Sequence, residues 1–283
     1  DLASNDATTT LPTVGGASSL GGDKAIVIDG NTGSWTAMST TNAPTARFYH
    51  FAHWTGSQMI VWGGNAGGNV GARFDYASNS WSQMSTTNAP PGLNLPASVW
   101  TGSKMIVWGT DNSNVGGIYD PVANSWTTTP TTTAPSGRRA ASAIWTGTQM
   151  IVWAGSRTGA ADFYNDGGIY DPATNTWTMM SVTNAPPTTY GHTAGWSGSQ
   201  MFVFGGYTGS GKNTGGVYTP ATNSWNMISS TNAPSPRWNI FGFSRSTVWT
   251  GSKFIIFSGE SANNTGAFFD LATNSWSALP TTN

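Results

Sequence analysis

The 283-residue chain contains no cysteine, little charge and no long apolar run. Without cysteine it has no disulfide, no thiol nucleophile and no cysteine-ligated metal. An apolar stretch of about 18 residues is absent, so the sequence predicts no membrane-spanning helix. Only 8% of the residues are charged and the formal net charge is −1, which argues against a nucleic-acid partner. One Glu (Glu260) and few Lys leave a shortage of good helix formers, so we expect little helix.

Glycine, proline and aromatic residues are abundant instead. The chain has 36 Gly and 15 Pro, and 12% of its residues are aromatic. These aromatic side chains can fill a core, so we expect a folded protein despite the low charge. A surface of Thr, Ser, Asn and Gly with few Lys or Glu indicates a secreted or extracytoplasmic protein. A first residue other than Met fits a processed mature form.

A tripeptide that ends in tryptophan recurs six times, at intervals of 45 to 51 residues. The six copies end at Trp35, Trp81, Trp126, Trp177, Trp225 and Trp276. Seven residues before each Trp stands an apolar or aromatic residue: Ile28, Phe74, Tyr119, Tyr170, Tyr218 and Phe269. A second signal, Trp-Thr-Gly-Ser or a close variant, begins at Trp54, Trp100, Trp145, Trp196 and Trp249 and precedes an apolar run. Repeats of this length are typical of stacked supersecondary units.

Each repeat predicts four short strands. Runs rich in β-branched and aromatic residues, bounded by Gly, Pro, Asn and Asp, are strand signals. The first strand ends at the Trp-Thr-Gly-Ser turn, the second is the apolar run, the third carries the Tyr or Phe, and the fourth begins at the repeated Trp. One unit cannot bury both of its faces, so we expect an all-β, six-bladed β-propeller of four-stranded antiparallel blades. This single domain spans 1–283, with blades at about 1–38, 43–85, 89–130, 134–181, 185–229 and 233–279.

The first unit departs from the pattern. Counting the repeat spacing across the join between the two termini predicts strands at 2–11, 15–20, 24–29 and 34–38. An alternative makes residues 25–28 the second strand and loses one strand. In the first interpretation the N-terminal segment closes the ring of its own chain, while pairing with a neighbouring molecule stays open.

The glycine pair after the second strand, the Tyr, and the Trp seven residues later resemble the kelch repeat, in the style of exported bacterial proteins. The resemblance covers nearly the whole chain and is clear in five units. It implies that the first strands line a central channel. It also implies that the loops from fourth to first strand and from second to third strand share one face, where kelch proteins usually bind. Kelch propellers host many tasks, so the resemblance specifies the fold better than the function.

The expected binding face carries arginines and aromatic residues at positions that vary between units. The ligand-binding candidates are Arg47, Tyr49, Arg138, Arg139, Tyr190, His192, Arg237, Trp238 and Glu260. Guanidinium groups bind carboxylates or phosphates, and aromatic faces stack on sugars or cations. The alternative is that the arginines belong to the repeat and pair with neighbouring carbonyls. Similarly, His50 and His192 hold equivalent positions, where the kelch pattern often has His for internal hydrogen bonds.

These residues predict a non-enzymatic binding module for a glycan or protein partner, with no catalytic residue, metal or cofactor assigned. The galactose-oxidase branch of the resembled family needs a Cys-linked Tyr, which the lack of Cys excludes. Two alternatives stay open. One is an extracellular self-assembling subunit or homo-oligomer, favoured by scant charge and a polar N-terminal segment. The other is a carbohydrate-active enzyme resembling the six-bladed sialic-acid mutarotases.

Overall fold

Short antiparallel strands make up the regular structure of the chain. The computed structural model describes residues 26–28, 35–64, 68–92, 95–110, 113–157, 162–238, 247–257, 259 and 265–280. Within these ranges the helical content is one turn of 3-10 helix, η1 (Pro220–Thr222), as the scarcity of helix formers predicts. The strands are β1 (Ile26–Ile28), β2 (Trp35–Ala37), β3 (Phe51–Trp54), β4 (Gln58–Trp62), β5 (Gly71–Asp75), β6 (Ser80–Gln83), β7 (Ala97–Trp100), β8 (Met105–Thr110), β9 (Ser113–Asp120), β10 (Ser125–Thr128), β11 (Ser142–Trp145), β12 (Met150–Trp153), β13 (Gly167–Asp171), β14 (Thr176–Met179), β15 (Thr193–Trp196), β16 (Met201–Phe204), β17 (Gly215–Thr219), β18 (Ser224–Met227), β19 (Thr247–Trp249), β20 (Lys253–Phe257), β21 (Gly266–Asp270) and β22 (Ser275–Ala278).

These strands form five four-stranded sheets and one two-stranded sheet. We number the sheets as blades in chain order: blade 1 is β1–β2, blade 2 is β3–β6, blade 3 is β7–β10, blade 4 is β11–β14, blade 5 is β15–β18 and blade 6 is β19–β22. In each four-stranded blade the strands pair in sequence order. The glycine of each Trp-Thr-Gly-Ser-type turn has a φ between 95° and 106°, a backbone conformation that side chains other than glycine rarely adopt.

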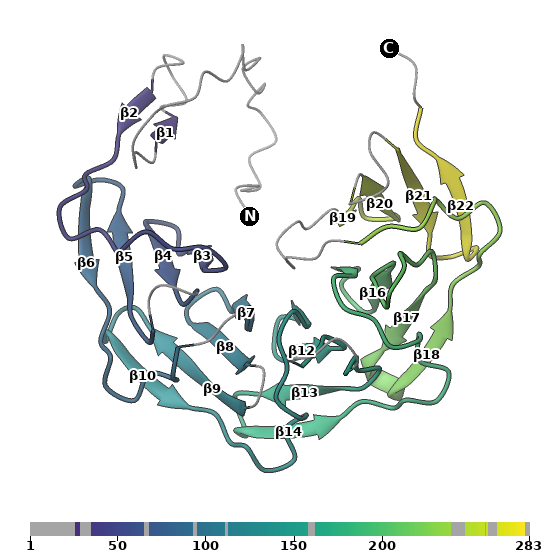
Figure 1. Cartoon of the computed structure of the whole chain (residues 1–283), viewed down its shortest axis with the longest axis horizontal. Coiled ribbons are helices and arrows are strands. Elements are labelled where there is room, and N and C mark those ends of the chain that lie inside the picture. Colours follow the sequence, from purple (N-terminus) through teal and green to yellow (C-terminus); the bar gives the residue numbers. More distant parts are fainter. Residues whose placement is uncertain are drawn as a thin grey trace.

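The blades follow one another around a common centre, with their fourth strands β6, β10, β14, β18 and β22 on the perimeter (Figure 1). The first strands of neighbouring blades contact each other along the series β3, β7, β11, β15 and β19. The expectation that the first strands lie at the centre is therefore confirmed for these five blades.

Blade 1 supplies a third and a fourth strand. Ile28 of β1 stands opposite Trp35 of β2, in the register that pairs Phe74 with Trp81 in blade 2. This shared register favours the interpretation of these two strands as a third and a fourth strand. The first and second strands expected at 2–11 and 15–20 lie outside the described residues.

The core lies between the blades, and the second strands of blades 3 to 5 are almost wholly buried. Ile151 and Trp153 of β12 pack against Met201 and Val203 of the next blade, and β12 and β16 are buried along their whole length. The other interfaces from blade 2 to blade 6 repeat this packing. Complete burial of one such side chain stabilises the fold by about 1.5–3 kcal/mol.

The repeated tripeptide joins each blade to the one before it. Trp126 donates its indole N–H to the carbonyl of Ser85, in the loop that leaves the preceding blade, over 2.9 Å. Asn124 accepts the backbone N–H of the same serine, also over 2.9 Å. The same two bonds recur at the tryptophans Trp81, Trp225 and Trp276. The motif therefore recurs because it binds one blade to the next.

One interface lacks these two bonds. Pro130 stands where the other loops have serine, and proline has no backbone N–H to donate. Opposite it, the indole nitrogen of Trp177 is buried without a hydrogen-bond partner among the described residues. Of the five seams that can be compared in this way, the seam between blades 3 and 4 is therefore the one without these two bonds.

Candidate functional site

Two sets of loops meet on one side of the blades. One set runs from the fourth strand of a blade to the first strand of the next, and the other joins second to third strands. We call the side that they form the channel face. Backbone bonds tie the two sets together: Tyr207 donates to the Tyr190 carbonyl over 2.9 Å, and Arg237 donates to the Lys212 carbonyl over 3.0 Å. Because the loops are hydrogen-bonded to one another, they present side chains from defined positions.

Three arginines hold these loops in the same way. Arg47 donates from Nη1 to the carbonyls of Gly63 and Val70, over 3.0 and 2.9 Å. Arg237 donates from Nε to the Ser235 carbonyl over 3.1 Å and from Nη1 to the Thr265 carbonyl over 3.1 Å. Each guanidinium thus links the loop that enters a blade to the loop between the second and third strands of that blade. Burial lowers the pKa of Arg47 and of Arg237 from the ordinary arginine value.

Arg138 is the most enclosed of the three. Its side chain has no exposed surface, and its Nη1 donates to the Asp166 carbonyl over 3.0 Å and to the Asp166 carboxylate over 2.7 Å. The ring centre of Tyr164 lies 4.0 Å from Cζ, within cation–π range. The alternative interpretation of the arginines, pairing with carbonyls of the repeat, accounts for all three. A direct ligand contact by Arg47, Arg138 or Arg237 stays a prediction.

We call the position of these arginines, which Thr189 holds in blade 5, the anchor position. The residue after the anchor position differs from blade to blade. These residues are Phe48, Arg139, Tyr190 and Trp238, which we call the rim residues. Phe48 is 54% exposed, and the other three are half-buried. Tyr49 meets Phe48 edge to face, with 4.5 Å between ring centres. Its φ of 62° is left-handed, as at the equivalent Leu95, Ala140 and Gly191, so this backbone shape belongs to the repeat.

Four half-buried rings form a continuous line over blades 4 to 6. Phe163 stacks on Tyr190 at 5.3 Å, Tyr190 meets Tyr207 at 5.9 Å, and Tyr207 meets Trp238 at 5.1 Å between ring centres. We call this line the aromatic row. A side chain at Gly211 would overlap the Trp238 ring, so glycine there lets the indole lie against the loop.

The family model of the KLHDC2/KLHL20/DRC7 Kelch-repeats domain matches residues 7–183 and 96–283, two overlapping placements that together span nearly the whole chain. The chain is a member of the kelch-repeat family. Its antiparallel four-stranded sheets are those of a kelch β-propeller, and domains of this kind generally mediate protein–protein binding. No curated protein matches the chain. In the described part of this kelch protein, no helix is long and apolar enough to cross a membrane.

The histidines of the kelch blades lie between first strands. His192 shares a 2.7 Å hydrogen bond with Ser142 of the preceding blade, and burial lowers the pKa of His192 to about 4. His53 shares a 2.6 Å hydrogen bond with Ser98 of the following blade. The pKa of His50 is lowered by burial and then by the charge of Arg47. Among the described residues no group of three or more His, Asp or Glu side chains could hold a metal ion. A ligand contact by His192 stays a prediction.

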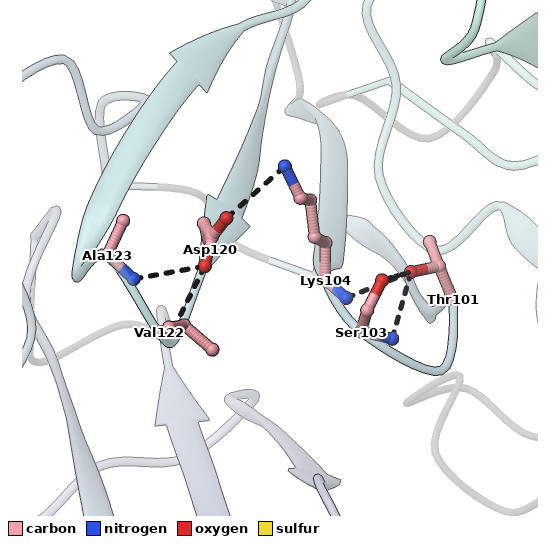
Figure 2. A network of polar contacts seen from close by, with 6 residues as sticks. All are labelled: Thr101, Ser103, Lys104, Asp120, Val122 and Ala123. Carbon is pink, nitrogen blue, oxygen red and sulfur yellow. Dashed lines mark hydrogen bonds and ion pairs between the residues drawn. The ribbon is translucent and has the colours of Figure 1, made fainter.

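The turn aspartates lie at the opposite end of the blades. Asp120 accepts the backbone N–H groups of Val122 and Ala123 over 2.9 and 3.1 Å and pairs with Lys104 over 3.3 Å (Figure 2). Hydrogen bonds from the turn backbone, Ala123 foremost, hold the pKa of Asp120 below its usual value. Asp75, Asp171 and Asp270 have lowered pKa values in the same kind of turn. These carboxylates therefore build the turns.

The loops that carry Arg47, Arg138, Tyr190 and Arg237 lie on the channel face, and a role of these residues in ligand binding stays a prediction. Glu260, another candidate, lies outside the described residues. Phe163 and Tyr207 were not among the candidates, because they lie in loops after the second strand that vary in length and sequence. The signal that could have found them is the presence of aromatic residues in otherwise polar loops.

Proposed function

We propose that this kelch protein is a non-enzymatic binding module that recognises a protein or glycan partner through its channel face. The observation that carries the proposal is the contrast between anchor and rim. Arginine recurs at the anchor position in three blades, whereas Phe48, Arg139, Tyr190 and Trp238 differ from one another. A repeating scaffold that presents a non-repeating set of large side chains suits recognition, because aromatic and Arg residues dominate binding hot spots.

We further propose that the module works outside the cytoplasm. The support is compositional: the chain has no Cys, and charged residues make up 8% of it. Fractionation of the source cells, followed by immunodetection, tests this location. Recovery of the protein in the cytosolic fraction would contradict it.

Arrays of glycans and of peptides test the binding function. The full-length protein is compared with the double variant Phe48→Ser/Trp238→Ser and with Val122→Ala, a control in a turn at the opposite end, where equivalent turns carry Ala. We expect ligands that the control retains and the double variant loses. Ligands that bind both variants equally would show that recognition lies elsewhere.

We also propose that residues 1–283 form one domain closed as six blades. Blade 1 has its third and fourth strands, and the 25 residues before β1 are enough for two more, since β15 to the start of β17 spans a similar length. The open face of blade 6 supports this closure. Val248 is 59% exposed and Phe257 is 49% exposed, whereas Phe204, at the position of Phe257 in blade 5, is 1% exposed.

The same apolar face favours a second candidate function, a self-assembling extracellular subunit. Exposed apolar patches mark contact surfaces, and few charges oppose association. Light scattering of the purified chain over a range of concentrations separates the two functions. A monomer at all concentrations supports the binding module, and concentration-dependent growth supports the assembling subunit.

A further inference from the structure

The aromatic row offers a surface that is held in place before a ligand arrives. Its four rings come from loops of blades 4, 5 and 6. The loops around Tyr190 and Tyr207 are bonded to each other through their backbones, and those of Lys212 and Arg237 are also bonded. A surface fixed in this way loses little conformational entropy on binding.

The row has half-buried rings and polar neighbours. A separate small cavity, lined by Thr189, His192 and Phe204 among others, measures about 10 Å³, which is room for one water, and none of the four rings lines it. Ser210 and Thr208 flank Tyr207 in the same loop. A half-buried row of rings edged by hydroxyl groups suits a flat, amphipathic ligand with an apolar face and hydroxyl edges. Sugar rings have this character.

Among the described residues around the row, positive charges outnumber negative ones. In the described parts of these loops the positively charged residues are Arg139, Arg157 and Lys212, and Asp162 is negatively charged. The carboxylate of Asp166 is paired with Arg138. An excess of positive charge attracts anionic ligands and disfavours cationic ones.

We propose that the aromatic row, with Lys212 beside it, binds an acidic oligosaccharide. The inference rests on the proposed function, because it names the ligand class of the same channel face. The sugar rings stack along Tyr190, Tyr207 and Trp238, and the carboxylates lie toward the cationic groups of blades 4 and 5. No covalent step is involved.

Isothermal titration with a galacturonic-acid oligomer tests the proposal, and the fully methyl-esterified oligomer serves as the uncharged counterpart. We expect the acid form to bind at least about tenfold more tightly than the ester and to weaken as salt rises. Trp238→Ala should weaken binding about tenfold through the lost stacking contact. Lys212→Gln should weaken it about threefold through the lost charge. Val122→Ala, remote from the row, should bind like the unaltered protein.

Several outcomes would overturn the proposal. They are equal binding of acid and ester, no effect of Trp238→Ala, or an equally strong response to a glutamate-rich peptide of the same charge. If no oligosaccharide binds but array ligands still depend on Phe48 and Trp238, the ligand class is wrong and the binding function stands. If neither class depends on these residues, both proposals fail.

Discussion

Arg138 Nη1 lies 2.7 Å from the Asp166 carboxylate, and the arginine that makes this pair has no exposed side-chain surface. The same nitrogen also donates to the carbonyls of Ala154 and Asp166. One guanidinium thus joins the two ends of the loop between β12 and β13 to the loop that enters blade 4.

Replacing Arg138 with leucine should therefore cost stability. Arg138→Leu leaves a half-buried carboxylate and the carbonyls of Ser136, Ala154 and Asp166 without their partner. We expect a loss of about 3 kcal/mol in the free energy of unfolding. Chemical denaturation measures it. Arg157→Gln, an exposed position nearby, is the control and should change stability by less than about 0.5 kcal/mol. An unchanged stability in Arg138→Leu would contradict the anchoring role.

The seam between blades 3 and 4 should accept a stabilising substitution. Pro130→Ser restores a backbone N–H that the Asn175 side chain can accept. We expect the loop then to place the carbonyl of residue 130 where it accepts the Trp177 indole N–H, as the Ser85 carbonyl does for Trp126. Two added hydrogen bonds stabilise the fold, and removing proline offsets part of this gain because the unfolded chain becomes more flexible. We expect a net rise of about 1 kcal/mol in the free energy of unfolding. Calorimetry should show a rise in melting temperature of about 2–4 °C.

The reciprocal substitution is the matched test of that seam. Ser85→Pro removes the N–H that Asn124 accepts and should lower the melting temperature by a comparable amount. If Pro130→Ser destabilises the protein, the Asn-Ser-Trp motif does not act as the link between blades.

The free energy of unfolding should decrease as the pH is lowered, because His192 titrates. Its folded pKa of about 4 lies below its unfolded value of 6.5, so between these values the unfolded state binds the extra proton. The stability is fully present above pH 6.5 and is lost as the pH falls toward 4, by up to about 3 kcal/mol. Urea denaturation between pH 7.5 and about 4.5 measures this loss before most turn aspartates protonate.

Two variants identify the titrating group. His192→Gln should reduce the pH dependence in this window and leave the part that His50 contributes through its own lowered pKa. Ser142→Ala removes the hydrogen-bond partner and keeps the imidazole, so the dependence should persist. An equal slope in the unaltered protein and in His192→Gln would assign the acid sensitivity to other groups.

The open face of blade 6 gives a test of six-blade closure. If residues 1–25 of the same chain cover this face, Val248→Asp buries a charge and should destabilise the protein by more than about 2 kcal/mol. Val122→Asp, at a residue that is 95% exposed, should be neutral. A neutral Val248→Asp in a monomeric protein would contradict closure. If the unaltered protein forms oligomers and Val248→Asp dissociates them, the result would support the self-assembling subunit.

The strand pattern was predictable because its signals are local. The continuous apolar run of β12 and the Tyr170–Trp177 spacing each follow from short-range periodicity, and the blades repeat them. Closure of the ring stays a prediction, because residues 1–25 carry few such signals and the choice of their partner depends on contacts between distant segments.

The role of the arginines could not be read from the sequence. Arg237 stands at a fixed offset from a loop proline, and that offset is compatible with both a carbonyl anchor and a ligand contact. The difference depends on where the loop after the second strand places its carbonyls, such as that of Thr265. Long-range placement of this kind is set by tertiary packing rather than by local sequence.

Amide hydrogen exchange of the full chain, with and without an array-selected ligand, tests most directly whether recognition belongs to the rim residues. We expect slower exchange on ligand binding in the loops around residues 47–50, 138–141, 189–192 and 237–238, and no change in the turns at 76–79, 121–124 and 172–175. Protection confined to those turns or to the perimeter strands would contradict recognition through the channel face.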